Sequence, residues 1–499
     1  MKKLFYMTSL ALLSMSAAQA ATSSVTFSKM WTYDHASTGV SGLLSEIPAY
    51  DQLTNTLWVA GVTGVDVLNA TSGSLVQHID TRSYGSINSV TVKNGVAAFA
   101  IENSVRTNAG VVTLFDTSTR SLLAGTNTIA VGALPDMLTF TPDGSKLLVA
   151  NEGTPSVYGS KVGNTVPANY GASASDPVGS VTVIDMTTRA VAATATLGGV
   201  ATTGTHIRTN TGMDFEPEYI AVSADGSKAY VTLQEANAIG ILDLNTNTFQ
   251  SVVGLGAKDF SAPGNQIDPS DRGGINFVSP NVKGLYMPDG IATYQSAGST
   301  YLVMANEGDY REDDADKARA SSLGVSGDAA RLQISTTDST AGDLYVAGAR
   351  SFSIRDAAGA LVYDSGDILD KEAALRGIYD DGRSDDKGVE PEGVALFQLG
   401  GMTIAAIGLE RTTQAAIALF DITDPNKVSF LDMIVSAGDI SPEGLVSFTA
   451  AGKTYLAFAN EVSGTTSVYQ VAAVPEPEQA ALWLAGLLAL VQAKRKKRA

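Results

Sequence analysis

Ten acidic residues of this sequence occur in five pairs whose spacing could assemble a cation-binding site. The first acid of each pair follows a proline, and the second ends an apolar run 16 to 18 residues later. The pairs are Asp136 with Glu152, Glu218 with Glu235, Asp289 with Glu307, Glu392 with Glu410, and Glu443 with Glu461. Carboxylate oxygens suit calcium best, and magnesium or manganese less well. A bound divalent cation, with calcium favoured, is therefore the first hypothesis for this set.

Two explanations remain open for the charge of these acids. Carboxylates that converge without compensation raise one another's pKa values and destabilise a fold, so something has to offset them. A cation would do so, and the amide oxygens of Asn151, Asn306 and Asn460 could add ligands. Otherwise the acids are turn residues that accept backbone N–H groups and pair with basic side chains. The basic candidates are Arg311, Arg383, Lys387 and Arg411.

The most highly charged stretch, RSDDKGVEPEG at 383–393, contains one of the paired acids. Its basic residues Arg383 and Lys387 are expected either to bind an anionic group beside the cation or to neutralise Asp385 and Asp386. In the first case a metal and a guanidinium would hold a phosphoryl group, as in a calcium-dependent phosphoesterase. The catalytic candidates are then Glu392 or Glu410 to orient water, with Arg383 and Arg411 on the phosphoryl oxygens.

No nucleophile motif accompanies these candidates. The sequence has no G-x-S-x-G, H-E-x-x-H or GxxxxGK[ST] pattern. A non-catalytic module that binds cations, glycan or protein is thus the first functional hypothesis, and an alkaline-phosphatase-like phosphoesterase is the alternative. Whether the protein is an enzyme stays open at this point.

The acid pairs mark the ends of repeated β-hairpins. Each pair encloses two apolar runs separated by turn residues such as Pro142-Asp143-Gly144, which is the pattern of two antiparallel strands. A third β-rich run follows most pairs, and two weaker copies, which contain Glu46 and Glu102, precede the first pair. Seven units predict an all-β fold, a seven-bladed β-propeller. A ring of six or eight blades, or a pair of β-sandwiches, is the alternative.

A propeller would bring the paired acids together. The first strand of each blade lines the central channel and the second returns beside it, so both acids of a pair lie at the same end of the ring. Residues 25–33 are expected to supply the outer strand that closes the last blade. Three long insertions, at 153–178, 256–283 and 309–388, interrupt the period.

The two ends of the chain carry export signals. Residues 1–20 have the charged start, apolar middle and Ala-Gln-Ala end of a secretory signal peptide, which implies the Sec machinery. Residues 473–499 contain Pro-Glu-Pro, an apolar segment and a basic end. They resemble the PEP-CTERM sorting signal of Gram-negative bacteria that make exopolysaccharide. This resemblance implies that an exosortase removes the segment. It also implies that the protein contacts the membrane only through a C-terminal helix, before processing. A plain C-terminal anchor is the alternative, and the propeller is expected over 21–472.

Composition disfavours several classes of function. The chain has 33 Lys and Arg against 51 Asp and Glu, and a net charge of −18. Such an acidic protein repels nucleic acid and anionic membrane surfaces, so no nucleic-acid partner is expected. The lack of cysteine excludes disulfides and thiolate metal ligands, and three histidines far apart in the sequence disfavour zinc.

The segments around the acids resemble the choice-of-anchor I family. The similar stretches are LPDMLTFTPDGSKLLVANEG (134–153), FEPEYIAVS (215–223), MPDGIATY (287–294), YLVMANEGDYRE (301–312), RSFSIRDAAGALVYDSGD (350–367), RSDDKGVEPEGVAL (383–396) and SPEGLVSF (441–448). The resemblance implies an exported propeller with an interchangeable C-terminal anchor, in the cell envelope, at the cell surface or in the extracellular matrix of a Gram-negative bacterium. Together the two resemblances suggest exopolysaccharide or a phosphoester as the ligand, the latter because relatives are often labelled alkaline-phosphatase-like.

Overall fold

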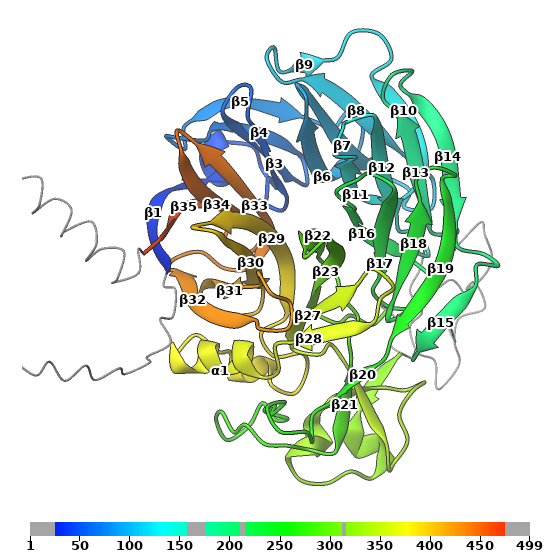
Figure 1. Ribbon diagram of the computed structural model, residues 1–499, viewed down its shortest axis with the longest axis vertical. Helices are drawn as coiled ribbons and strands as arrows, with labels where there is room; N and C mark the ends of the chain where they lie inside the picture. Colours follow the sequence, from blue (N-terminus) through cyan, green and yellow to red (C-terminus); the bar gives the residue numbers. More distant parts are fainter. Residues whose placement is uncertain (1–24, 157–175, 210–214, 312–315, 475–499) are drawn as a thin grey trace, which may run out of the picture. The chain divides into compact units, whose positions relative to one another are not determined.

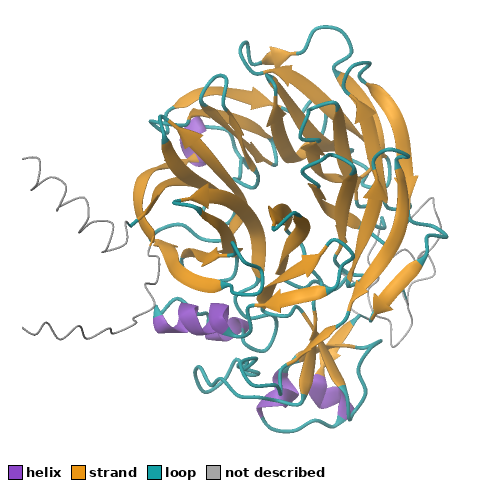
Figure 2. Ribbon diagram, viewed as in Figure 1, coloured by secondary structure: helices purple, strands orange, loops and turns teal. Residues whose placement is uncertain are grey.

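Nearly all regular structure in this protein is β-strand. The computed structural model describes residues 25–156, 176–209, 215–311 and 316–474. Thr26–Ala472 forms one compact unit, and strands dominate it (Figure 2). The prediction of an all-β fold is confirmed. The predicted signal peptide and nearly all of the predicted sorting signal lie outside the described residues. No described helix combines the length and the apolar character that a membrane crossing needs.

In the described part of the chain, seven sheets have four or five strands each, and all but one of their strand pairs are antiparallel. The first three consist of β2 (Pro48–Asp51), β3 (Thr56–Gly61), β4 (Gly64–Asn69) and β5 (Leu75–Asp80); β6 (Ser86–Lys93), β7 (Val96–Glu102), β8 (Ala109–Asp116) and β10 (Thr128–Ala133), with β9 (Ser121–Leu122) on β8; and β11 (Pro135–Phe140), β12 (Lys146–Asn151), β13 (Ser180–Asp185) and β14 (Ala190–Thr196). Each sheet follows the chain order from its first strand outward.

The other four large sheets follow the same order, except that an earlier strand of the chain takes the outer edge in the first and in the last of them. They consist of β16 (Pro217–Val222), β17 (Lys228–Leu233), β18 (Ala238–Asp243) and β19 (Thr248–Leu255), with β15 (Thr202–Thr205) parallel to β19; β22 (Ile291–Ser296), β23 (Ser299–Asn306), β27 (Ser351–Asp356) and β28 (Leu361–Asp364); β29 (Pro391–Leu399), β30 (Met402–Leu409), β31 (Ala415–Asp421) and β32 (Ser429–Ser436); and β33 (Pro442–Ala450), β34 (Lys453–Asn460), β35 (Thr465–Ala473) and β1 (Val25–Asp34).

The first strands of these sheets contact one another in a closed cycle. β2 contacts β6, β6 contacts β11, β11 contacts β16, β16 contacts β22, β22 contacts β29, β29 contacts β33, and β33 contacts β2. The sheets therefore surround a common axis, with their first strands innermost (Figure 1). This is a propeller-like arrangement.

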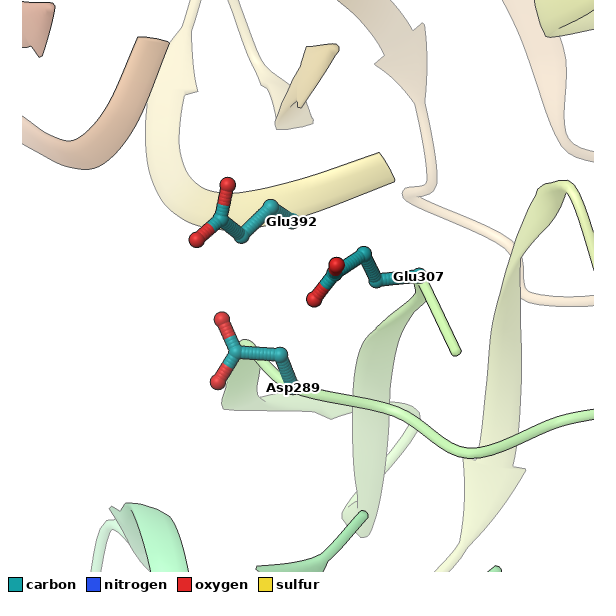
Figure 3. Close-up of side chains that lie close together, drawn as sticks. All are labelled: Asp289, Glu307 and Glu392. Carbon is teal, nitrogen blue, oxygen red and sulfur yellow. The ribbon is translucent and has the colours of Figure 1, made fainter. Parts of the chain in front are cut away.

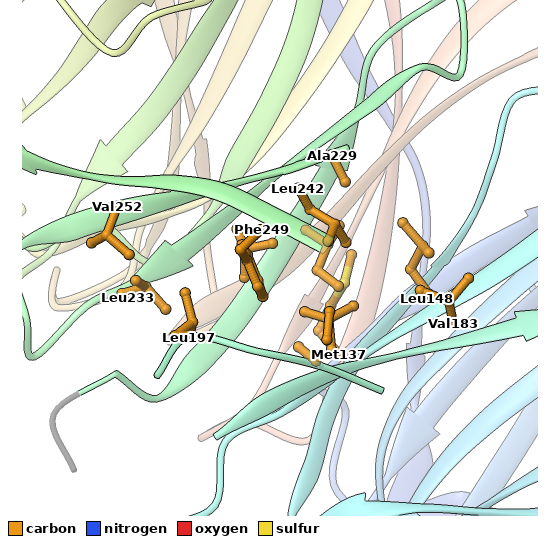
Figure 4. Close-up of a cluster of buried hydrophobic side chains, with 14 of the residues drawn as sticks. Met137, Leu148, Val183, Leu197, Ala229, Leu233, Leu242, Phe249 and Val252 are labelled. Atoms are coloured by element: carbon orange, nitrogen blue, oxygen red, sulfur yellow. The ribbon is translucent and has the colours of Figure 1, made fainter. Parts of the chain in front are cut away.

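Apolar side chains fill the space between neighbouring sheets. Between the sheets that begin with β11 and β16, the cluster includes Leu148, Val183, Leu233 and Leu242, all fully buried (Figure 4). Because both faces of the middle strands are covered, these strands are continuous apolar runs rather than alternating ones. The clearest is β30, in which every residue after Met402 is buried.

The N-terminal strand completes the last sheet, as the sequence led us to expect. β1 lies beside β35, and the 3-10 helix η1 (His35–Thr38) follows it. His35 is fully buried; its Nδ1 lies 2.8 Å from Asp66 Oδ2 in the first sheet, and its Nε2 lies 2.8 Å from Thr466 Oγ1 in the last sheet. Burial alone would raise the pKa of Asp66, but hydrogen bonds with His35, Thr38 and His78 outweigh it and lower that pKa. This network joins the two ends of the cycle.

We expect His35→Ala to lower the free energy of unfolding by about 3 kcal/mol, because it removes two buried hydrogen bonds, to Asp66 and to Thr466, and leaves a cavity at a fully buried position. Urea unfolding followed by circular dichroism measures the loss. His206→Ala is the control, since His206 is exposed and, among the described residues, its ring hydrogen-bonds to the adjacent Thr205 and contacts Tyr345. Equal losses in the two variants would contradict a role of His35 in closing the cycle.

The third insertion is shorter than the sequence indicates. The sequence interpretation assigns all of 309–388 to an insertion, but β27 and β28 lie within it and complete the sheet of β22 and β23. The long chain segment between β23 and β27 obscures the regular spacing of the repeats in the sequence. The remainder contains α1 (Ile368–Leu375) and three 3-10 helices, η2 (Ala320–Leu323), η3 (Asp328–Arg331) and η4 (Asp381–Arg383). It also contains the paired strands β24 (Lys317–Arg319) and β25 (Gln333–Ser335). A further strand, β26 (Leu344–Ala347), forms a small sheet with β20 (Ala257–Asp259) and β21 (Val282–Leu285).

Candidate functional site

The paired acids gather around one cavity at the beginnings of the first strands. Its volume is about 320 Å³. Eight of the ten paired acids line it: Asp136, Glu152, Glu218, Glu235, Asp289, Glu307, Glu392 and Glu443. Asp309 adds a further carboxylate, and Arg106 is the one basic residue that lines it among the described residues. The cavity is therefore strongly acidic.

Glycine next to the acid lets neighbouring sheets approach at this cavity. A Cβ atom at Gly290 would lie 2.2 Å from the carbonyl oxygen of Glu392, and one at Gly393 would lie 2.1 Å from that of Glu443. Any other residue would collide with the backbone of the next acid. The recurring Pro-(Asp/Glu)-Gly sequence thus brings carboxylates of adjacent sheets together.

The backbone before the acids has an unusual conformation that recurs. Leu134, Met287, Glu390 and Ser441 each directly precede the proline and have positive φ angles between 42° and 64°. In three of these repeats, and in the repeat that begins at Pro217, the pairing register also shifts directly after the proline, which marks a β-bulge. Non-glycine residues rarely adopt positive φ, and bulges change the direction of side chains. The same backbone distortion recurs where the acids point into the cavity, and not in the direction that the regular alternation of side chains along a strand would give them.

Burial and mutual repulsion raise the pKa values of the acids. The pKa of Asp136 rises from 3.8 to about 7, first through burial and then through repulsion by Glu102. The pKa of Glu46 rises from 4.5 to about 8, through burial and then repulsion by Glu461 and Asp136. The same causes hold the pKa values of further acids well above their usual range: Glu152, Glu218, Asp289, Glu392 and Glu443. Without a cation, these acids therefore hold their protons to a higher pH than ordinary carboxyl groups do.

A second cavity, whose lining residues carry no charge, adjoins the carboxylates. Its volume is about 200 Å³; it shares Ile47, Ser89, Met137 and Tyr219 with the first and is otherwise lined mainly by residues of the first strands, including Leu138 and Val446. Such surroundings screen charge poorly. This environment explains why burial is the leading cause of the raised pKa values.

Two buried carboxylate oxygens of the cavity have no hydrogen-bond partner among the described residues. They are Oε2 of Glu218 and Oε2 of Glu392; the residue Glu218 is only 9% exposed. A buried carboxylate oxygen without a donor is costly and therefore rare. A cation bound beside either oxygen would give that oxygen a partner.

Three of the lining acids have the spacing of metal ligands. One oxygen each of Asp289, Glu307 and Glu392 lies within 4.8 Å of the other two, and their carboxylates converge (Figure 3). Calcium binds oxygen at roughly 2.3–2.6 Å, so oxygens up to about 5 Å apart can share one ion. Asp289 precedes β22, Glu307 follows β23 and Glu392 lies in β29, so two neighbouring sheets form this group. We call it the first carboxylate group.

A second carboxylate group, Glu307, Glu390 and Glu410, shares Glu307 with the first and has the same spacing. Its charges are already paired. Lys387 Nζ lies 2.8 Å from Glu307 Oε1 and 2.9 Å from Glu390 Oε2. Arg383 pairs with Glu390, and Arg411 Nη2 lies 2.7 Å from Glu410 Oε1.

The basic residues of RSDDKGVEPEG therefore bind carboxylates rather than standing free for an anion. Arg383 pairs with Glu390 and lies 3.0 Å from Asp386, so the expected neutralisation of Asp386 is observed. Asp385, by contrast, pairs with Arg319 and Arg331 of the insertion, which corrects the expectation for that residue. The sequence could not reveal these partners because they are far away along the chain.

Four further predicted residues lie away from the first group. Glu410 belongs to the second group, and its pKa rises to about 8 through burial and repulsion by Glu307. Glu461 does not line the cavity but repels Glu46 and Glu443. Arg311 is fully buried, 3.5 Å from Glu216. Arg411, a catalytic candidate, is paired with Glu410.

Two of the three asparagines next to the second acids have their amide oxygens engaged by the fold. Asn151 Oδ1 accepts a hydrogen bond from Gly132 N, and its Nδ2 donates to Ser180 and Thr182. Asn306 Oδ1 accepts from Ser353. None of these asparagines is among the described residues that line the cavity. The Oδ1 atoms of Asn151 and Asn306 already accept hydrogen bonds, whereas Asn460 Oδ1 is buried without a hydrogen-bond partner among the described residues.

Sequence analysis missed Glu390 and Gln234 as members of the site. Gln234 Nε2 donates to Glu307 Oε2 at 2.9 Å, and Glu390 belongs to the second group. The position of Glu390, directly before the proline, holds Leu134, Met287 and Ser441 in three other repeats but a glutamate, Glu216, in a fourth. The recurrence of Glu-Pro-Glu, in a stretch already rich in charge, was the signal available.

A family comparison identifies the chain. The model of the choice-of-anchor I domain matches residues 46–425, which is most of the sequence. The chain belongs to the choice-of-anchor I family. Choice-of-anchor domains are typical of exported, surface-associated proteins.

Comparisons with other proteins give no further identification of this family member. No curated protein matches it. Among solved structures, the hydrazine synthase of Kuenenia stuttgartiensis is 11% identical with a TM-score of 0.49, covering 86% of this chain and 96% of that one. A mitotic checkpoint complex chain is 11% identical with a TM-score of 0.49, covering 95% of this chain and 99% of that one.

Proposed function

We propose that this protein is an exported, surface-associated β-propeller that binds a divalent cation, calcium in the first place, in its carboxylate-lined cavity. It acts as a non-catalytic binding module of the cell envelope or of the surrounding exopolysaccharide. The family supports a surface-associated location. The proposed export route uses the Sec machinery and an exosortase.

The proposed fold is a propeller of seven blades closed by β1. The closed cycle of contacts among seven first strands and the outward strand order in each sheet support this number. In such a ring the ends of the first strands converge on the axis. A cation on the axis would be reached from several blades at once.

The observation that carries the proposed function is the first carboxylate group in its surroundings. Asp289, Glu307 and Glu392 converge, and no ion pair is recorded for Asp289 or Glu392 among the described residues. Glu218 and Glu392 each keep a buried oxygen without a partner. Carboxylate oxygens favour calcium over softer metals, and an adaptable site favours it over magnesium.

Glu392→Gln tests this assignment. The variant removes one anionic ligand with little change in size, so we expect calcium affinity to fall on the order of 10- to 100-fold. Isothermal titration calorimetry on EDTA-treated protein measures the change, with magnesium as a second titrant. The matched control is Glu372→Gln, which alters a glutamate of α1 paired with Arg376. If both variants bind calcium as the wild type does, the cavity is not the calcium site.

The contacts of the arginines do not favour the phosphoesterase alternative. Arg383 and Arg411, the expected phosphoryl ligands, are engaged by Glu390 and Glu410. A non-catalytic role therefore remains our proposal, with exopolysaccharide as the proposed ligand class.

A further inference from the structure

The second carboxylate group has the geometry of a metal site but contains a cation supplied by the chain. The oxygens of Glu307, Glu390 and Glu410 lie as close together as those of the first group. The Lys387 ammonium lies between two of them, at 2.8 Å from Glu307 and 2.9 Å from Glu390, and the residue is only 7% exposed. A lysine ammonium is a compact point charge with three donors, so it can take the position of an ion.

The charges of the two groups differ accordingly. In the second group Lys387, Arg383 and Arg411 offset the carboxylates. In the first group, the shared Glu307 contacts a cationic side chain, whereas Asp289 and Glu392 have no recorded ion pair within the described ranges. A cation from solution binds most favourably where the charge of the carboxylates is not already offset by basic side chains. Of the two groups, this is the first carboxylate group.

We propose that Glu307, Glu390 and Glu410 form a second cation site that the Lys387 ammonium fills permanently, so that a divalent ion is confined to the first group. The confinement rests on the proposed function, because it assumes that the first group binds calcium. The existence of the lysine-filled site does not. Lys387 is thus a positioning residue: with Gln234 it fixes the carboxylate of Glu307, which belongs to both groups.

Removing the ammonium opens the second site to solvent cations. Lys387→Met keeps much of the length of the side chain and removes its charge, leaving Glu307 and Glu390 without their bridging cation. We expect this variant to bind one calcium ion more per chain than the wild type. A merely structural role of Lys387 would lower stability without adding a bound ion.

Equilibrium dialysis against calcium, with the metal counted by plasma mass spectrometry, measures the number of ions per chain. Lys427→Met is the control for the loss of one positive charge, because Lys427 is an exposed partner of Asp424. Adding Glu410→Gln to Lys387→Met is expected to remove the extra ion again. Lys387→Gln replaces the methionine variant if circular dichroism shows that the latter does not fold.

The outcomes separate the two proposals. No calcium on the wild type rejects the proposed function, whereas the comparison of Lys387→Met with the wild type decides the inference. An equal number of ions in the two proteins overturns it, and so does an extra ion that also appears with Lys427→Met or persists with Glu410→Gln. One extra ion that requires Glu410 supports it, whatever the wild type binds.

Discussion

Saturating calcium is expected to raise the melting temperature of the protein, and EDTA is expected to reverse the rise. A ligand that binds only the folded state stabilises it by about 2.7 kcal/mol at 100 times its dissociation constant. Here the ion also replaces repulsion among Asp289, Glu307 and Glu392. Differential scanning calorimetry at increasing calcium concentration measures the effect.

Ionic strength has to be matched in this experiment, because the chain carries a net charge of −18 and any salt reduces its self-repulsion. Sodium chloride at equal ionic strength is therefore the reference, and Glu392→Gln is the variant in which the calcium effect should shrink. Identical shifts with calcium and with sodium chloride would show that no specific site is present.

The calcium-free protein is expected to lose stability as the pH rises from about 4.5 to 8. Asp136, Glu46 and Glu410 have raised pKa values in the folded state, about 7, 8 and 8, against usual values of 3.8, 4.5 and 4.5. Across this window the folded state binds more protons than the unfolded state, so the free energy of unfolding falls with pH. A tenfold difference in acidity between the two states corresponds to about 1.4 kcal/mol, and all three acids act in the same direction, so together they lower the free energy of unfolding as the pH rises.

Urea unfolding at pH values from 5 to 8.5, with EDTA and at high salt, measures this fall. High salt screens the surface charges while leaving buried pairs less affected. Asp143 and Asp225 have pKa values lowered to about 2 and titrate below this range. With saturating calcium, which keeps its ligands ionised, the fall should become smaller. A calcium-free protein whose stability rises through this range would contradict the assignment of these acids.

The repeats were predictable because local sequence determines them. Hairpins such as β11–β12 depend on adjacent apolar runs and on turn residues; Asp143 Oδ1, for example, accepts hydrogen bonds from Thr141 and Ser145 within the predicted turn. β27 was missed because the insertion separates it from its partner β23. Periodicity reveals a strand only when the spacing to its partner is kept.

The first acids of the site were predictable from the repeat, but their partners were not. Pro-Asp and Pro-Glu recur in the sequence and mark strand starts, so their meeting at one cavity follows from the topology. The pairing of Lys387 with Glu307, 80 residues apart in the chain, depends on how the insertion folds back. Composition alone cannot distinguish a lysine that binds an anionic ligand from a lysine that pairs with a carboxylate of the same chain.

The position of β1 beside β35 also constrains how the chain can fold during synthesis. Thr26 and Ala472, which are hydrogen-bonded, lie 446 residues apart in sequence. The edge strand of the last sheet is thus made first and has to wait, unpaired, for nearly the whole chain to leave the ribosome. A prematurely terminated chain lacks the partner of β1 and leaves an open sheet edge, which marks incomplete molecules for aggregation or degradation.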